Sequence, residues 1–419
     1  MTVTAEPPIA DAAGSAAGSA TAPPADLRAD REVLASLAEA MATLDHPTKA
    51  DVSRWAAAEL AQFDRVAADR ESGFALDDWR RCAERGVHGL MVPVADGGQG
   101  ADLATTLLTL EGLGHGCRDN GLIYAITSQM LSTQVALAEF ANPEQKERYL
   151  RPLLTADRIG AFAMTEPEAG SDAYSITARA VRTDDGYSIS GHKTYITLAS
   201  RCDFVIVFAS TNPEVGRWGL SAFIVPMDTP GVERVGNREK MGMRTTPFGD
   251  IKLHDVEVPA DALLGREGAG ASIFNAVLEV ERAFVFAPAI GVTERVLDES
   301  IAFSKAREQG GAPISTYQAV AHRLVEMKRR HETARLFLYR AALSVALGRD
   351  VATYAALAKL VASETGIEAA LQSVEVHGAR GYVSEYEVER NVRDAIGGLV
   401  YSGTSDIQRN IVARLLGVG

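Results

Sequence analysis

Cysteine is scarce in this chain, and the sequence has no long apolar run. Cys82, Cys117 and Cys202 are odd in number and widely spaced, which gives neither a disulfide framework nor a metal-binding pattern. The longest nearly apolar run, residues 283–292, is far too short to span a bilayer. The N-terminus lacks the basic and apolar segments of a secretory signal. We therefore expect a reduced, cytoplasmic protein with no metal and no membrane partner.

Basic residues are outnumbered by acidic ones, 42 to 55, and the net charge is −13. This balance argues against nucleic acid as the main partner, because phosphate binding needs clustered Lys and Arg. Aromatic residues make up only 6% of the chain, but hydrophobic residues make up 47% of its 419 residues. A chain of this length and composition can bury a large core, divided among two or three packed units.

The character of the sequence changes three times along the chain. Residues 1–29 are rich in Ala, Pro, Gly and Ser and cannot offset their ordering entropy by burial, so we expect a disordered tail. Residues 30–159 carry apolar side chains at helical spacing. Residues 160–266 contain short runs rich in Val, Ile and Phe, which predict a small β barrel or sandwich. Residues 267–419 return to long helical segments that suit an antiparallel bundle.

Several element boundaries can be predicted from turn and cap residues. Gly86 follows a helical segment and is expected to end it. In AVRTDDGYSISGHKTYIT, residues 180–197, an Asp-Gly turn and a second turn at Gly191 predict three strands. In the C-terminal part we expect helices over residues 271–289, 291–307, 315–345, 351–378 and 400–415.

One loop has the chemistry of a ligand site. In TEPEAGSD, residues 165–172, Gly170 permits close backbone approach. Thr165 and Ser171 supply short hydroxyls, and main-chain N–H groups can meet an anion. The same residues also suit an ordinary capped loop, so the pattern alone leaves both interpretations open.

Three longer motifs carry a family resemblance. They are FAMTEPEAGSDAYSITARA (162–180), GHKTYIT (191–197) and NVRDAIGGLVYSGTSDIQRNIVARLLG (391–417). In this order and spacing they resemble the acyl-CoA dehydrogenase family of flavoproteins, and the resemblance covers about residues 35–419. It implies an α+β multidomain fold with an N-terminal α-helical domain, a middle β-barrel domain and a C-terminal four-helix bundle.

The resemblance also implies FAD, held between barrel and bundle and reaching a neighbouring subunit. This sequence departs from the family pattern at four positions. Tyr195 stands where the family usually has Trp, and Gly310 where it usually has Phe. Glu375 and Ala379 replace the usual Gln and Gly. Arg307 matches the arginine that meets the cofactor pyrophosphate across the subunit interface. The implied FAD contacts are Phe162, Met164, Thr165, Gly170, Ser171, Tyr195, Thr197, Arg307, Gln318, Glu375, Gly378, Ala379, Thr404 and Asp406.

The family reaction is α,β-dehydrogenation of an acyl thioester, and it needs a carboxylate base. Most members carry a glutamate where this chain has Ser402. Isovaleryl- and long-chain-type members instead carry the base before an arginine on another helix, a position matched by Glu281 and Arg282. Apolar neighbours in the sequence predict that the pKa of Glu281 is raised. Without the resemblance, a helix glutamate in a salt bridge is the usual outcome.

The remaining expectations concern substrate and partners. The resemblance implies substrate contacts at Ser171, Glu279, Arg282, Ser402 and Gly403. Ser402 leaves space that suits a branched or cyclic acyl group, carried by CoA or an acyl carrier protein. Electron-transfer flavoprotein is the expected electron acceptor, and a homodimer or homotetramer is the expected assembly.

Two other hypotheses remain open at the level of sequence. One is a flavin-dependent monooxygenase on the same scaffold, which does not need the glutamate. The other is a non-catalytic flavoprotein that has lost its base, which would bind FAD without being reduced by a thioester.

Overall fold

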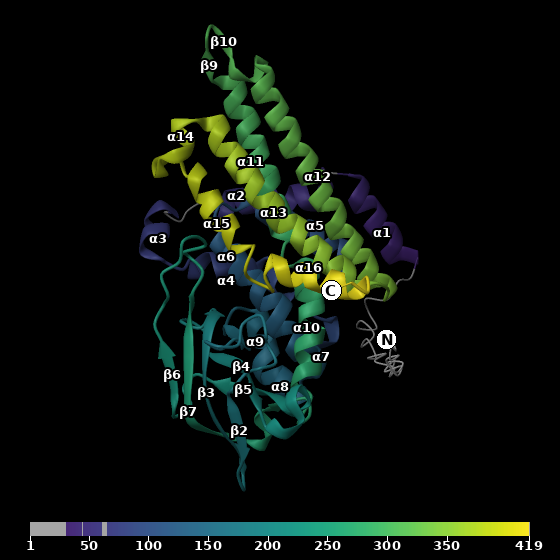
Figure 1. Cartoon of the computed structure of the whole chain (residues 1–419), viewed down its shortest axis with the longest axis vertical. Helices are drawn as coiled ribbons and strands as arrows, with labels where there is room; N and C mark the ends of the chain where they lie inside the picture. The colour runs from purple at the N-terminus through teal and green to yellow at the C-terminus, as the bar shows by residue number, and fades with distance from the viewer. Residues whose placement is uncertain (1–30, 44, 61–64, 419) are drawn as a thin grey trace, which may run out of the picture.

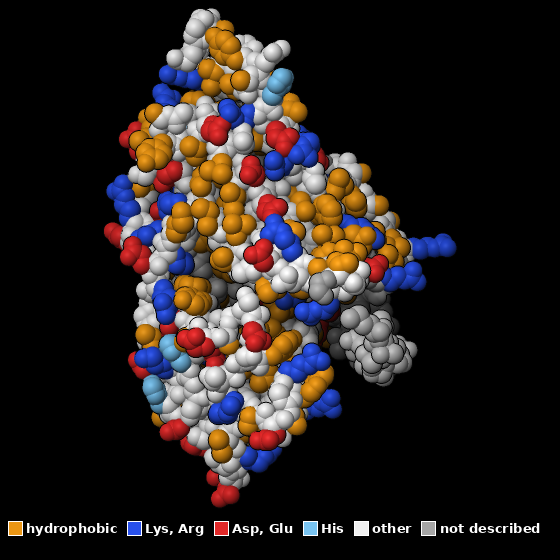
Figure 2. Space-filling view, in the orientation of Figure 1, with side chains coloured by type: hydrophobic (Ala, Val, Ile, Leu, Met, Phe, Trp, Pro, Cys, Tyr) orange, Lys and Arg blue, Asp and Glu red, His pale blue; other side chains and the backbone are white. Residues whose placement is uncertain are grey.

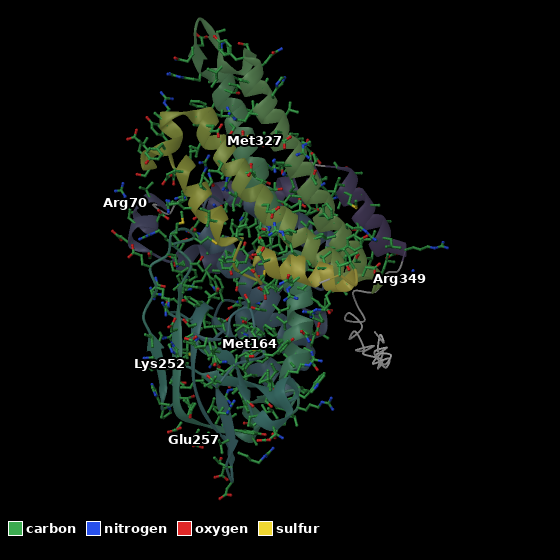
Figure 3. The ribbon with its side chains drawn as sticks, viewed as in Figure 1. Arg70, Met164, Lys252, Glu257, Met327 and Arg349 are labelled. Carbon is green, nitrogen blue, oxygen red and sulfur yellow. The ribbon has the colours of Figure 1, made fainter. Side chains whose placement is uncertain are left out.

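The computed structural model describes residues 31–43, 45–60 and 65–418. The tail expected over residues 1–29 lies outside them. The described chain runs through helices, then a β-sheet, then a second set of helices (Figure 1). The long C-terminal helices occupy the upper half of the molecule and the sheet occupies the lower half. Figure 3 shows the same division, with Met327 among the upper helices and Met164 in the sheet-containing half.

The N-terminal domain is helical, and its helix ends follow the cap residues. Gly86 adopts a φ of +84° just after α4, so it ends that helix as predicted. Asp102 caps α5 by accepting a hydrogen bond from the Thr105 amide at 2.7 Å. The helices are α1 (Arg31–Ala42), α2 (Pro47–Glu59), α3 (Arg65–Glu71), α4 (Leu76–Glu84), η2 (Val87–Gly89), η3 (Val94–Asp96), α5 (Leu103–Gly116), α6 (Asn120–Ser128), η4 (Gln129–Gln134), α7 (Val135–Phe140), α8 (Pro143–Gln145), η5 (Lys146–Leu150) and α9 (Arg151–Leu154).

The middle domain is built on one eight-stranded sheet of order β6-β7-β3-β2-β4-β5-β8, with β1 pairing in parallel with β4. The Val, Ile and Phe side chains of β4 and β5 are buried and contribute to its hydrophobic core. Its strands and short helices are β1 (Gly160–Ala163), β2 (Arg179–Arg182), β3 (Gly186–Thr197), β4 (Phe204–Ser210), η6 (Pro213–Gly219), β5 (Leu220–Pro226), β6 (Val232–Val235), β7 (Phe248–Pro259), η7 (Ala260–Ala262) and β8 (Leu263–Leu264).

The turn expected at Gly191 is wrong. Strand β3 is continuous over 12 residues, and its pairing with β7 shifts register between Ile189 and Gly191. A Cβ atom at Gly191 would lie 2.5 Å from the Cβ of Ala178. The glycine is therefore explained by close approach of another segment within the sheet rather than by a turn.

The C-terminal domain is dominated by long helices that pack on one another and on α5. Helices α12 and α13 run side by side through the upper half of the molecule (Figure 1). The elements are α10 (Gly270–Phe284), α11 (Ala287–Ala306), β9 (Glu308–Gln309), β10 (Ala312–Pro313), η8 (Ile314–Thr316), α12 (Gln318–Leu347), α13 (Val351–His377), α14 (Ala379–Tyr382), η9 (Ser384–Tyr386), α15 (Val388–Gly397) and α16 (Ser405–Leu415).

Two helix boundaries in this domain differ from the prediction. The break between α10 and α11 falls before Ala287, not near residue 290, because Pro288 lies in the first turn of α11 where its missing N–H costs nothing. The helix expected over 400–415 begins only at Ser405, since Thr404 caps it and the preceding residues form a turn. No described helix has both the length and the apolarity that crossing a membrane requires.

Candidate active site

Two side chains from distant parts of the sequence meet at the site. Glu281 lies on α10, and Ser402 lies in the turn before α16. The Ser402 hydroxyl donates a hydrogen bond of 2.6 Å to Oε1 of Glu281. The sequence assigned only a spacing role to Ser402, so this contact was not predicted.

The turn that carries Ser402 is held in an uncommon conformation. Ser402 has a φ of +55° and Gly403 a φ of +85°. The Gln408 side chain donates to the carbonyl oxygens of both residues, at 3.0 and 3.1 Å. A non-glycine residue with positive φ persists only where its surroundings fix it, so the Ser402 hydroxyl is held toward Glu281 by the local backbone.

The surroundings of Glu281 favour a protonated carboxyl more than water does. Burial raises the pKa of Glu281, while the Ser402 hydrogen bond and the Arg282 charge oppose that rise. A carboxylate with a raised pKa is a stronger base than an exposed one. Arg282 lines the same cavity, and among the described residues its buried Nε has no hydrogen-bond partner.

Two tyrosines near Glu281 were missed by the sequence analysis. The rings of Tyr124, on α6, and Tyr401 have centroids 4.5 Å apart, and Tyr401 stacks on Phe286 at 5.1 Å. The pKa of each tyrosine is raised, first by burial and further by the Glu281 charge. Both hydroxyls therefore stay protonated. Tyr401 could have been noticed as the neighbour of Ser402, whereas Tyr124 sits in an ordinary apolar helix.

A cavity of about 650 Å³ opens beside Glu281, between the sheet and the helices. The surface is hollowed between the helical and sheet-containing halves (Figure 2). This volume is in the usual range for a cofactor or substrate site. The structure brings these predicted residues to its wall: Phe162, Met164, Thr165, Gly170, Ser171, Tyr195, Thr197, Glu281, Arg282, Ser402 and Gly403.

A buried ion pair anchors the loop of residues 165–172, which lines the cavity. Lys193 is fully buried and binds Oε1 of Glu166 at 2.8 Å and the Met164 carbonyl at 3.0 Å. Glu166 also accepts the amides of Thr177 and Ala178. These contacts tie the loop to β3, the strand that carries Tyr195 and Thr197 at the cavity wall.

The residues at the wall fit a flavin. Gly170 lines the cavity, and a Cβ atom added there would meet nothing within 4 Å, so a side chain would project into the open space. Thr165, Ser171 and Thr197 offer short hydroxyls, and Tyr195 offers an exposed ring. Such a set can hydrogen-bond a polar ring edge and cover an aromatic face.

A second group of predicted FAD contacts does not line this cavity. Arg307 ends α11, Gln318 begins α12, and Gly378 and Ala379 follow α13, all toward the β9–β10 end of the molecule (Figure 1). Glu375 forms an ion pair with Arg323. Within one chain the structure does not bring this group to the cavity, so an FAD role for it requires a second subunit.

The remaining predicted residues lie close to the cavity without lining it. Thr404 caps α16 by accepting from the Ile407 amide at 3.2 Å. Asp406 is exposed and pairs with Arg409 at 3.0 Å. Glu279 is half-buried on α10, and burial raises its pKa. None of the three touches Glu281 through a hydrogen bond or ion pair that the described residues form.

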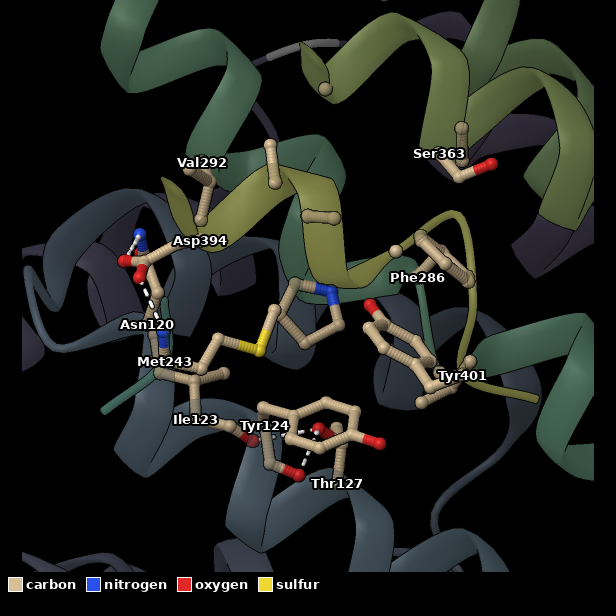
Figure 4. A pocket seen from close by; sticks show the side chains of 17 residues that line it. Asn120, Ile123, Tyr124, Thr127, Met243, Phe286, Val292, Ser363, Asp394 and Tyr401 are labelled. Carbon is tan, nitrogen blue, oxygen red and sulfur yellow. Dashed lines mark hydrogen bonds between the residues drawn. The ribbon is translucent and has the colours of Figure 1, made fainter. Parts of the chain in front are cut away.

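A smaller cavity of about 70 Å³ lies behind the two tyrosines (Figure 4). Tyr124 borders both cavities, and Tyr401 borders the smaller one. Most of its lining is apolar, including Ile123, Met243 and Val292. Tyr124 therefore lies at the boundary between the Glu281 cavity and this apolar space.

Comparison with known proteins identifies the family. Three domain families of acyl-CoA dehydrogenase match in order: the N-terminal domain over residues 46–157, the middle domain over 161–256 and the C-terminal domain over 268–417. The chain belongs to the acyl-CoA dehydrogenase family. The predicted family and fold class are confirmed.

Individual relatives cover most of the chain. L-prolyl-[peptidyl-carrier protein] dehydrogenase of Pseudomonas fluorescens is 37% identical over 344 residues, covering 82% of this chain and 90% of that protein. Probable acyl-CoA dehydrogenase YngJ of Bacillus subtilis is 38% identical over 349 residues, covering 83% and 91%. The solved structure of PigA with FAD and proline superposes with a TM-score of 0.84 at 32% identity, covering 93% and 99%. The prediction of an FAD-dependent oxidoreductase that acts on CH–CH groups of acyl thioesters is confirmed at this level.

Proposed function

We propose that this chain catalyses α,β-dehydrogenation of an acyl thioester with Glu281 as the base. The observation that carries the assignment is the cavity-facing Glu281 carboxylate, whose Oε1 accepts a hydrogen bond of 2.6 Å from Ser402. The position that holds the base in most of the family thus holds a partner of the base here. This arrangement supports proton abstraction from α10 rather than from the C-terminal turn.

In the proposed step the substrate loses a proton and a hydride, and each has its own acceptor. The Glu281 carboxylate takes the α-proton and becomes a neutral carboxyl, while the Cα–H electron pair forms the new double bond. FAD, when bound, accepts the β-hydride. The raised pKa of Glu281 matches this task, because the carboxyl can hold a proton that an exposed carboxyl would release. Arg282 places a positive charge beside the carboxylate and favours its ionised form before the reaction.

The tyrosines favour a compact acyl group. Tyr124 lines both the Glu281 cavity and the apolar pocket, and its ring lies 4.5 Å from that of Tyr401. A straight alkyl chain would have to displace one ring to pass, whereas a short branched or cyclic group would fit in front of the pair. The names of the relatives support a thioester carried either by CoA or by a carrier protein.

The remaining site and partner assignments are proposals as well. Thr165, Ser171, Tyr195 and Thr197 would hold the flavin of the same subunit, and the Arg307 group would reach the flavin of a neighbouring subunit. Electron-transfer flavoprotein is the proposed acceptor, and a homodimer or homotetramer is the proposed assembly.

The decisive experiment is anaerobic reduction of the purified holoprotein. It is mixed with matched CoA and carrier-protein thioesters of a branched, a cyclic and a long straight acyl group, and the flavin absorbance is followed. Bleaching by a compact acyl thioester is expected, without bleaching by the long straight one. Bound FAD that no thioester bleaches would favour a non-catalytic flavoprotein, and oxygen consumption after chemical reduction with product hydroxylation would favour a monooxygenase.

A further inference from the structure

Strand β3 is irregular where it borders the cavity. Its register against β7 shifts between Lys193 and Ile196. Tyr195, inside this shift, has a φ of +58°, and its side chain is 56% exposed at the cavity wall. Positive φ is uncommon for an aromatic residue, so the surrounding contacts must hold Tyr195 in this conformation.

The carboxylate of Asp250, on the neighbouring strand β7, supplies several of those contacts. Its Oδ1 accepts from the Thr194 hydroxyl at 2.9 Å and lies 3.4 Å from the Tyr195 amide. Its Oδ2 lies 3.0 Å from Nε2 of His192. The carboxylate is buried, yet hydrogen bonding by Arg238 holds its pKa well below the usual range. Asp250 therefore holds β3 at His192, just before the register shift, and at Thr194 and Tyr195 within it.

Arg238 connects this carboxylate to the tyrosine ring. Its Nε and Nη2 bind the two Asp250 oxygens at 2.6 Å each, a bidentate geometry that orients the guanidinium. The guanidinium carbon lies 4.9 Å from the ring centroid of Tyr195. The Phe248 ring lies 6.3 Å from the same ring at an angle of 28°. The Tyr195 ring is thus supported by charge and by stacking before any cofactor binds.

We propose that Arg238 and Asp250 are positioning residues for the flavin, which set the Tyr195 ring as a wall of the cofactor cavity. The inference rests on the proposed function only in placing the flavin in this cavity. Neither residue lines the cavity, so both act through Tyr195. Loss of the pair should leave the ring free to change rotamer and should weaken FAD binding.

The test is FAD affinity of the apoprotein, measured by titration with the quenching of flavin fluorescence. Arg238→Met is expected to weaken FAD binding on the order of tenfold. The change removes the cation over the Tyr195 ring and the bidentate hydrogen bonds to Asp250. Arg234→Met is the matched control. Arg234 lies on β6, four residues before Arg238. It donates to the Ala199 and Cys202 carbonyls, at 2.7 and 2.9 Å, without touching Tyr195. We expect the FAD affinity of Arg234→Met to stay within about twofold of the parent.

A double-mutant cycle separates positioning from general stability. In a Tyr195→Ala background, Arg238→Met should cause no further loss of affinity, because the ring that it positions is gone. An equal loss in both backgrounds would overturn the inference. If Arg238→Met does not fold, the same cycle with Arg238→Lys decides, since lysine keeps the charge but cannot form the fork. A parent that binds no FAD would overturn the proposed function itself, so the two failures are distinguishable.

Discussion

At the scale of single residues, the Ser402 hydroxyl opposes the effect of burial on the pKa of Glu281. It donates to a half-buried carboxylate that burial pushes toward the neutral form. A hydrogen bond to the ionised form favours ionisation. We therefore propose that Ser402 positions Glu281 and keeps it available as the base.

Ser402→Ala should shift the acid limb of the rate profile. Removal of the donor raises the pKa of Glu281 further, so a higher pH is needed to ionise the base. The measurement is the rate of anaerobic flavin reduction from about pH 5 to pH 9, at saturating thioester. The acid limb is expected to move to higher pH, with a loss of about tenfold or less at neutral pH, since one hydrogen bond to a charged group is removed. A uniform decrease without a shifted limb would indicate a purely steric role for Ser402.

Glu281→Gln should stabilise the fold at high pH. Because burial raises the folded pKa, the stability associated with the protonated group is present below the ordinary glutamate pKa. It is lost as the pH rises through the raised value. The glutamine variant should therefore melt at a higher temperature than the parent at about pH 8, and the difference should shrink toward about pH 4.

The matched control for this comparison is Glu84→Gln, on the exposed surface of α4. It is expected to show no pH-dependent difference in melting temperature. An identical pH dependence in both variants would mean that burial of Glu281 does not affect stability.

At the scale of elements, strand β3 connects the walls of the cavity. Lys193 and Tyr195 lie at the same register shift of β3. The Lys193 side chain contacts Glu166, and the Tyr195 ring contacts Arg238. Burial lowers the pKa of Lys193 to about 8, although the Glu166 charge opposes this. The ion pair is therefore present at neutral pH and ties the loop to the strand.

Lys193→Met should destabilise the protein by about 3–5 kcal/mol, because it leaves the Glu166 carboxylate buried without its cation. Urea unfolding of the holoprotein measures this loss. Glu166→Gln in the same chain should recover part of it, since the neutral amide tolerates burial better. Lys252→Met, which removes a partly exposed cation 4.0 Å from Glu233, should cost about 1 kcal/mol or less. A similar loss in Lys193→Met and Lys252→Met would contradict the anchoring role.

The sequence predicted elements better than their irregularities. Helical periodicity located the long C-terminal helices, and the Asp-Gly turn located the hairpin of β2 and β3. The turn at Gly191 was wrongly predicted because the sequence does not distinguish a glycine required by close approach of Ala178 from a glycine in a turn. The Ser402–Glu281 contact joins residues 121 positions apart, and Tyr124 reaches the site only through packing, so no local pattern reveals either. The motif resemblance predicted the residues that line the cavity, whereas the contacts that hold these residues in place became visible only in the structure.

At the scale of the whole molecule, apolar side chains remain exposed on the long helices. Val325 and Leu336 on α12 are 66% and 53% exposed, and Leu371 on α13 is 42% exposed. Figure 2 shows apolar side chains gathered over the helical half. Because 11 residues complete about three helical turns, Val325 and Leu336 lie on one face of α12. Such a face suits a contact with a second copy of the chain.

The holoprotein should therefore sediment as a dimer or tetramer of the 44.6 kDa chain. Leu336→Glu should shift it toward the monomer, because a carboxylate would be buried in the contact. Arg307→Ala should lower FAD content without changing the assembled mass, if Arg307 reaches the flavin of a neighbouring subunit. A monomer with full FAD content would contradict both the assembly and the role of the Arg307 group.

The central claim is that Glu281, rather than the C-terminal turn, carries the base. The most direct measurement is stopped-flow flavin reduction under anaerobic conditions, with one reactive thioester and three proteins: the parent, Glu281→Gln and Ser402→Ala. Glu281→Gln should retain FAD but reduce it about 10²–10⁴-fold more slowly, the usual contribution of a positioned general base, while Ser402→Ala should lose far less. Reduction of the Glu281→Gln flavin at the parent rate would contradict the claim.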